Sequence, residues 1–175
     1  MTEPGSRPKA AIFVDVENQT DLRVSELMER LRGYDIVERQ AYADWRNWCL
    51  DGLAEQLEDA NFQLYYARSG RYIGARKNTA DGYMVRGILD AFTRRPEITI
   101  FIIVSGDGYF NHITRDLRKR GKAVIVAANP DRVNRLLRGQ ANCYLPLGEA
   151  GSWTPGEYLP DAPSGCKEST HERYV

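Results

Sequence analysis

The chain has 175 residues, 42% hydrophobic and 27% charged, which is enough to build one domain with a sizeable apolar core. Its 24 basic and 24 acidic residues cancel, and residues 1–145 carry 22 basic against 19 acidic residues, so charge alone does not indicate a nucleic-acid partner. Three widely separated cysteines exclude a disulfide framework and a cysteine-rich zinc site, and the polar N-terminus lacks a signal or membrane segment. We therefore expect a cytoplasmic protein with no membrane partner.

Short apolar runs along the chain predict β-strands that alternate with helical patterns. This alternation is typical of a mainly parallel sheet with helices on both faces, so we expect a three-layer α/β sandwich with five to six strands. The predicted strands are residues 10–16, 37–44, 62–68, 98–105 and 123–128, with a short sixth at 142–147. An apolar edge strand at 142–147 could also support a homodimer.

Helical periodicity appears between these runs. The predicted helices are residues 22–33, 46–60, 79–95, 109–121 and 131–139. The helix at 79–95 has the strongest apolar stripe, with Tyr83 and Gly87 on it, and Trp48 and Leu136 are predicted to face the core in two of the others. We expect one domain over residues 10–147, a flexible N-terminus at 1–9, and a disordered or loosely docked tail at 148–175.

Acidic residues occur where the sheet should place a site. Asp15 ends the first predicted strand, Asp107 follows the most apolar one, and Asp81 lies in the first turn of a helix with Thr79 as its expected N-cap. Each could simply interact with a helix N-terminus. Three carboxylates at one sheet edge would repel one another, however, and a hard divalent cation such as Mg²⁺ or Mn²⁺ would relieve that repulsion. Such an ion suits phosphodiester hydrolysis.

Three motifs carry a resemblance to a known family. They are IFVDVEN at 12–18, KNTAD at 77–81 and IIVSGDGYF at 102–110. In this order they resemble the NYN domain, the PIN-like group that includes LabA-like bacterial proteins. The resemblance implies a metal-dependent ribonuclease fold with Asp15, Asp81 and Asp107 as metal ligands. It also implies that Asn18 lies beside the site, where its amide could orient the metal, a carboxylate or the substrate.

Three positions depart from the pattern of that family. Tyr109, Gly87 and Asn142 stand where many members carry further acidic residues. The departures favour one metal ion at most. They also keep open a non-catalytic RNA-binding or protein-interaction module on the same fold.

Aromatic and basic residues together suggest contacts with RNA. Arginine and lysine bind phosphates, and tyrosine rings stack on unpaired bases. The candidate residues are Arg68, Arg71, Tyr72, Arg76, Lys77 and Tyr109. A solvated loop whose tyrosines pack on the domain edge is the alternative.

We therefore expect a Mg²⁺-dependent endoribonuclease that acts on single-stranded or structured RNA. A phosphohydrolase of the haloacid-dehalogenase kind is a further alternative. It would use Asp15 as nucleophile, with D-x-E at Asp15 and Glu17 and G-D-x-x-x-N at 106–111, each differing from that pattern by one residue.

Overall fold

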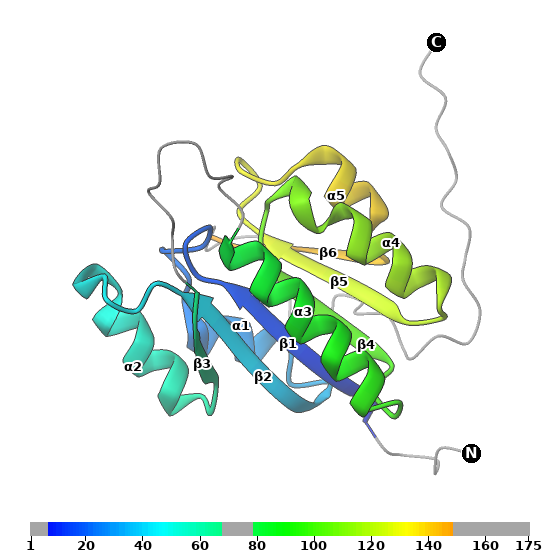
Figure 1. The fold of residues 1–175 in the computed structure, drawn as a ribbon, viewed down its shortest axis with the longest axis horizontal. Helices are drawn as coiled ribbons and strands as arrows, with labels where there is room; N and C mark the ends of the chain where they lie inside the picture. The colour runs from blue at the N-terminus through cyan, green and yellow to red at the C-terminus, as the bar shows by residue number, and fades with distance from the viewer. Residues whose placement is uncertain (1–6, 68–78, 149–175) are drawn as a thin grey trace.

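A computed structural model describes residues 7–67 and 79–148 of the chain (Figure 1). Its centre is a six-stranded sheet in which every pair of neighbours is parallel, in the order β3-β2-β1-β4-β5-β6. The strands are β1 (Lys9–Asp15), β2 (Asp35–Ala43), β3 (Gln63–Tyr66), β4 (Ile100–Val104), β5 (Ala123–Ala128) and β6 (Cys143–Pro146). The predicted α/β class and parallel sheet are confirmed.

The order of strands reverses next to β1. The chain runs outward from β1 to β2 and β3, then returns to place β4 on the other side of β1, where Val14 pairs with Val104. In open parallel sheets, ligands bind in the crevice at the carboxyl ends of the strands at such a reversal. The ends of β1 and β4 are therefore the position at which a site is expected.

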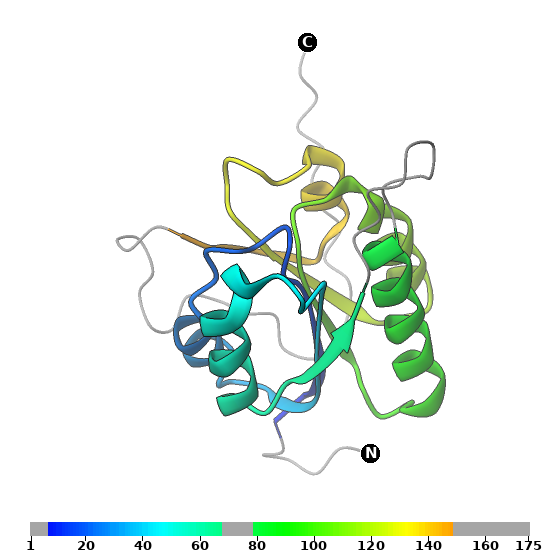
Figure 2. The ribbon, with the colours of Figure 1, turned by 60° about the vertical axis from the view of Figure 1, so that its left-hand side comes forward.

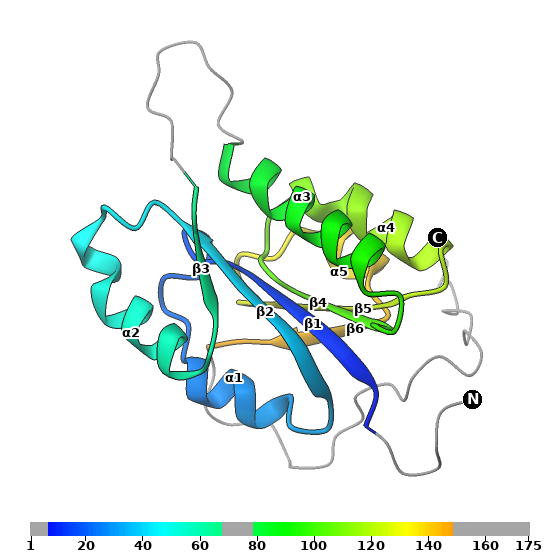
Figure 3. The same ribbon diagram turned by 60° about the horizontal axis from the view of Figure 1, so that its bottom comes forward.

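Helices cover both faces of the sheet (Figure 2 and Figure 3). They are α1 (Val24–Arg30), α2 (Asp51–Asp59), α3 (Thr79–Arg94), α4 (Asn111–Lys119) and α5 (Arg135–Gln140). Alternate residues of β1 separate the two cores: Ile12 and Val14 pack on the side of α1 and α2, and Phe13 packs on the side of α3, α4 and α5. Asp15 continues the second series, so its side chain is directed to the side of α3.

The predicted strands lie within one or two residues of the observed bounds, but three core predictions are wrong. Tyr83, on the predicted apolar stripe of α3, is 49% exposed. Trp48 is 78% exposed, because residues Trp48–Leu50 form a separate 3₁₀ turn and α2 begins only at Asp51. Leu136 is 67% exposed, because α5 is a short helix that turns only Leu137 inward. Within the described ranges, no helix is long and apolar enough to cross a membrane.

Candidate active site

Asp15 and Ser105 meet where β1 and β4 end. Asp15 is only 5% exposed, and its Oδ2 accepts a hydrogen bond of 2.8 Å from the hydroxyl of buried Ser105. The same hydroxyl oxygen accepts a bond of 3.1 Å from the backbone N–H of Asp107. Ser105 therefore links the first predicted acid to the loop that carries the third.

Asn18 joins the loop after β1 to the loop after β4. Its Oδ1 accepts hydrogen bonds of 2.8 Å from the backbone N–H of Gly106 and of 2.8 Å from the amide of Gln19. The resemblance implies that Asn18 lies beside the site and orients the metal, a carboxylate or the substrate. Its amide oxygen holds two loops together here, so Asn18 positions Asp15 and Asp107 relative to one another.

Gly106 is required by a close approach of the chain after β5. A Cβ at this position would lie 2.8 Å from the carbonyl oxygen of Arg132 and 3.1 Å from the Cα of Val133. The N–H of Asn134 also donates to the carbonyl of Gly106 at 2.8 Å. The loop before α5 thus buttresses the S-G-D-G turn, a contact that only long-range packing reveals.

Asp107 caps the short 3₁₀ turn Gly108–Phe110. Its Oδ1 accepts a hydrogen bond of 2.9 Å from the N–H of Tyr109. This is the capping role that an acid after a buried strand often has. One carboxylate oxygen is thereby engaged, while the side chain as a whole stays exposed to solvent.

The three aspartates influence one another electrostatically. Burial raises the pKa of Asp15 to about 7; the hydrogen bonds from Ser105 and from the Asn18 backbone oppose the rise, and the charges of Asp81 and Asp107 add to it. The pKa of Asp81 rises to about 6 through burial, then through the charges of Asp107 and Glu17. The charge of Asp107 therefore acts on both Asp15 at the end of β1 and Asp81 in the first turn of α3.

Glu17 is an additional member of this site that we did not select from the sequence. Besides acting on Asp81, its Oε1 accepts a hydrogen bond of 3.2 Å from the N–H of Asp44, at the end of β2. Asp44 is itself buried and bound by both Nε and Nη2 of Arg46, at 2.8 and 2.6 Å. The signal was present in the D-V-E-N motif, where Glu17 follows Asp15 by two residues.

The donors of this site suit a hard divalent cation, although they do not form a preformed cage. In the part of the chain that the structure describes, no group of three or more Asp, Glu, His or Cys is arranged to hold a metal. Magnesium commonly binds one or two carboxylates directly and keeps several waters, so it does not need such a cage. The pKa values of Asp15 and Asp81 are raised first by burial and then by the charges of neighbouring acids, so a bound cation would favour the charged forms of both.

The positions that depart from the family pattern have different structural roles. A Cβ on Gly82 would lie 4.0 Å from the hydroxyl of Tyr109, which places this tyrosine beside the first turn of α3 and Asp81. A Cβ on Gly87 would overlap the hydroxyl of Tyr42. The side-chain oxygen of Asn142 accepts a hydrogen bond of 2.9 Å from the N–H of Val124, near the amino end of β5. The acids lie at the opposite, carboxyl ends of the strands. Asn142 therefore has no part in this site.

The remaining predicted RNA contacts cannot be placed. Arg68, Arg71, Tyr72, Arg76 and Lys77 lie outside the described residues.

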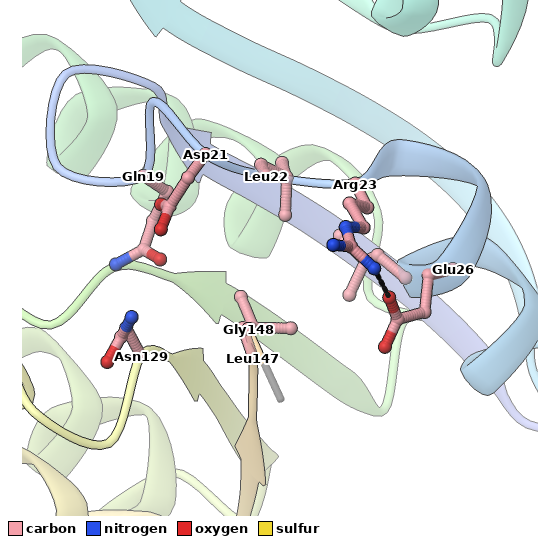
Figure 4. Close-up of a pocket in the computed structure, with 9 residues that line it drawn as sticks. Gln19, Asp21, Leu22, Arg23, Glu26, Asn129, Leu147 and Gly148 are labelled. Carbon is pink, nitrogen blue, oxygen red and sulfur yellow. Dashed lines mark ion pairs between the residues drawn. The ribbon is translucent and has the colours of Figure 1, made fainter. Parts of the chain in front are cut away.

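A small hollow lies near the strand ends, between the loop after β1 and the turn after β5 (Figure 4). Its lining includes Gln19, Asn129 and Leu147, and its volume of about 20 Å³ is room for one water rather than a substrate.

Comparison with known proteins agrees with this architecture. A family model described as the NYN domain matches residues 9–148. A crystal structure of a protein of unknown function from Vibrio parahaemolyticus is similar, with 25% sequence identity and a TM-score of 0.66; the match covers 85% of this chain and 98% of that chain. No curated protein matches.

Proposed function

This chain belongs to the NYN domain family, and from that premise we propose that it is a Mg²⁺-dependent endoribonuclease with its active site at Asp15, Asp81 and Asp107. The family suggests a nuclease-like, RNA-related function. The metal-dependent step is supported by the acids at the reversal of strand order, where burial raises the pKa of Asp15 to about 7 and that of Asp81 to about 6, and the charge of Asp107 adds to both shifts. A divalent cation is the partner that this cluster lacks.

Each protein group has a defined task in the proposed reaction. When bound, the ion would supply charge neutralisation and lower the pKa of a water near the scissile phosphate. Asp15 would be held in one orientation by Ser105, and Asp107 by its cap on Tyr109. Asp81 would hold the ion from the side of α3, so that the helix as well as the sheet would contribute a ligand.

Cleavage of a quenched single-stranded RNA oligonucleotide tests this proposal. We expect product in Mg²⁺ or Mn²⁺, none in EDTA, and a loss of at least about 100-fold in Asp15→Asn and Asp107→Asn. Glu55→Gln, an exposed substitution on α2, is the matched control and should retain full activity. Cleavage that persists in EDTA, or in a folded Asp15→Asn, Asp107→Asn double variant, would contradict the metal site.

A non-catalytic RNA-binding module is the second candidate. Its support is specific: Tyr42 occupies the space beside Gly87, where the family pattern often has another acid. Binding of RNA without cleavage in any divalent metal would establish this function instead. The haloacid-dehalogenase alternative receives no support, because the family model that matches residues 9–148 is the NYN domain.

A further inference from the structure

A groove runs beside the acidic site, between α3 and the edge of the sheet. On this side α3 packs over β1 and β2, while β3 packs against α2 on the opposite face. The resulting groove has a volume of about 350 Å³, and Tyr42, Tyr65, Tyr83, Arg86 and Gly87 are among the residues that line it. It is large enough for one nucleotide unit and lies within the described part of the chain.

The sheet register connects this groove to the acids. Asp15 pairs with Tyr42 across β1 and β2, and Tyr42 pairs with Tyr65 across β2 and β3. Residues in register on parallel strands point to the same face, so the three side chains form a row on the side of α3. Two strand spacings separate the ends of the row, roughly 10 Å, which is within reach of a nucleotide next to the scissile phosphate.

The groove offers a rigid aromatic surface. The rings of Tyr42 and Tyr65 stack with centroids 5.1 Å apart and an angle of 16°. Tyr42 is buried and its hydroxyl donates to Gln40, while the indole N–H of Trp45 donates to the carbonyl of Tyr65 at 3.0 Å. Tyr65 remains 39% exposed, so the face of its ring that Tyr42 does not cover is available for stacking.

Helix α3 supplies the opposite wall. Tyr83, Arg86, Gly87 and Asp90 fall on one face of the helix, at i, i+3, i+4 and i+7. Tyr83 is 49% exposed. Gly87 allows the Tyr42 ring to lie directly beneath the helix, since any side chain here would fill the space that the tyrosine occupies.

The charge of this region complements a nucleic-acid backbone. A second hollow of about 440 Å³ shares Tyr65 with the groove and adds Arg39, Arg94 and Arg95 to its lining. Together with Arg86, these four cations face three acids: Arg94 pairs with Glu38 and Asp90, and Arg95 pairs with Glu38 and Glu97. Among the described residues, Arg86 has no ion-pair partner, so its guanidinium is available for a phosphate.

We propose that this groove binds an unpaired nucleotide of single-stranded RNA next to the cleavage site, with its base in contact with both Tyr65 and Tyr83 and its phosphate on Arg86. The inference rests on the proposed function, because it names the form of RNA that the acidic site would receive. Bases in a duplex are already stacked and paired, so the groove selects single strands.

Fluorescence anisotropy in EDTA measures binding separately from cleavage and from metal. The probe is a labelled oligouridine, compared with the same strand in a duplex with oligoadenosine. We expect Tyr83→Ala to weaken single-strand binding about tenfold and Tyr83→Phe to preserve it, because stacking needs the ring and not the hydroxyl. We expect Arg86→Ala to reduce the slope of log K against log salt by about 0.7, the loss of one phosphate contact on a single strand.

Two exposed residues provide matched controls. Leu89→Ala removes an apolar side chain from the same helix outside the groove, and Arg135→Ala removes a charge from α5. Both should bind as the unsubstituted protein does. The proposed binding groove would be wrong if Leu89→Ala weakened single-strand binding as much as Tyr83→Ala does. It would also be wrong if the duplex bound more tightly than the single strand.

The outcomes also separate the two proposals. Groove-dependent binding without cleavage in any metal would uphold the groove and reject the nuclease. Metal-dependent cleavage that is lost in Asp15→Asn, combined with single-strand binding that is unchanged by Tyr83→Ala and Arg86→Ala, would uphold the nuclease and reject the groove.

Discussion

The hydroxyl of Ser105 donates to Asp15 Oδ2 at 2.8 Å, although the two residues lie 90 positions apart in the chain. This bond opposes the rise in the pKa of Asp15 that burial causes. The backbone N–H of Asp107 donates to the same hydroxyl. A single side chain thus sets the orientation of two proposed metal ligands.

Ser105→Ala should therefore impair both stability and metal binding. We expect a loss of about 1–3 kcal/mol in the free energy of unfolding, since a buried carboxylate and a backbone N–H each lose a partner. The affinity for Mg²⁺ should fall because the pKa of Asp15 rises further. Urea unfolding and a Mg²⁺ titration measure these effects, with exposed Ser25→Ala as control. Unchanged unfolding would contradict the proposed importance of this bond.

Removal of the Asp15 charge should stabilise the metal-free protein. Folding raises the pKa of Asp15 from 3.8 to about 7, so the folded state favours the protonated form. The stability of the unsubstituted protein in EDTA should accordingly fall as the pH rises from about 4 to about 7. Asp15→Asn lacks this loss and can still accept the bond from Ser105.

Thermal unfolding across this pH range provides the measurement. At pH 8 in EDTA, the free energy of unfolding of Asp15→Asn should exceed that of the unsubstituted protein by about 2–4 kcal/mol, and this difference should shrink toward pH 4. Mg²⁺ should raise the Tm of the unsubstituted protein and leave the variant unchanged. A less stable Asp15→Asn at pH 8 would show that the carboxylate is not destabilising in the fold.

Gly87 and Tyr42 should be coupled in a double-mutant cycle. Alanine normally stabilises a helix interior by about 1 kcal/mol relative to glycine. Here Gly87→Ala should destabilise by about 1–3 kcal/mol, because the new Cβ overlaps the Tyr42 hydroxyl. Tyr42→Phe removes that hydroxyl, so the double variant should recover part of the loss. Simple additivity in chemical denaturation would argue against the contact.

Gly106 and Gly139 provide a second contrast. A Cβ at Gly106 would meet backbone atoms, whereas a Cβ at Gly139 meets nothing within 4 Å. Gly106→Ala should cost at least about 2 kcal/mol and reduce RNA cleavage, because either the loop before α5 or the turn that carries Asp107 must move. Gly139→Ala should be neutral or stabilising. Similar melting temperatures for both variants would show that the close approach of the chain at Gly106 does not constrain the site.

The sequence predicted the elements well because their signals are local. Buried parallel strands appear as continuous apolar runs, and helix α3 shows its periodicity directly. Asp15 and Asp107 were selected because residues at strand ends have predictable positions. For Asp81 the local signal is weaker, since its position is equally typical of an acid near a helix N-terminus, and the family resemblance strengthens the link to the other two.

The features that the sequence did not predict depend on register and packing. That Tyr42 lies beneath Gly87 depends on how β1 pairs with β2, including an irregularity between Ala10 and Ala11 that shifts the pairing. Asn142 lies at the end of the sheet opposite to the acids because β6 runs parallel to β5. Trp48 was assigned to the core because a 3₁₀ turn and the start of an α-helix are difficult to distinguish from the sequence alone.

The position of β4 beside β1 also determines when the site can form. A chain emerging from the ribosome can pair β1 with β2 early, but Asp15 remains without Ser105 and Asp107 until 90 more residues have been made. Contacts of such long range form slowly and close large loops. We expect a partly synthesised chain to lack a complete site until β4 and the turn that carries Asp107 have been made.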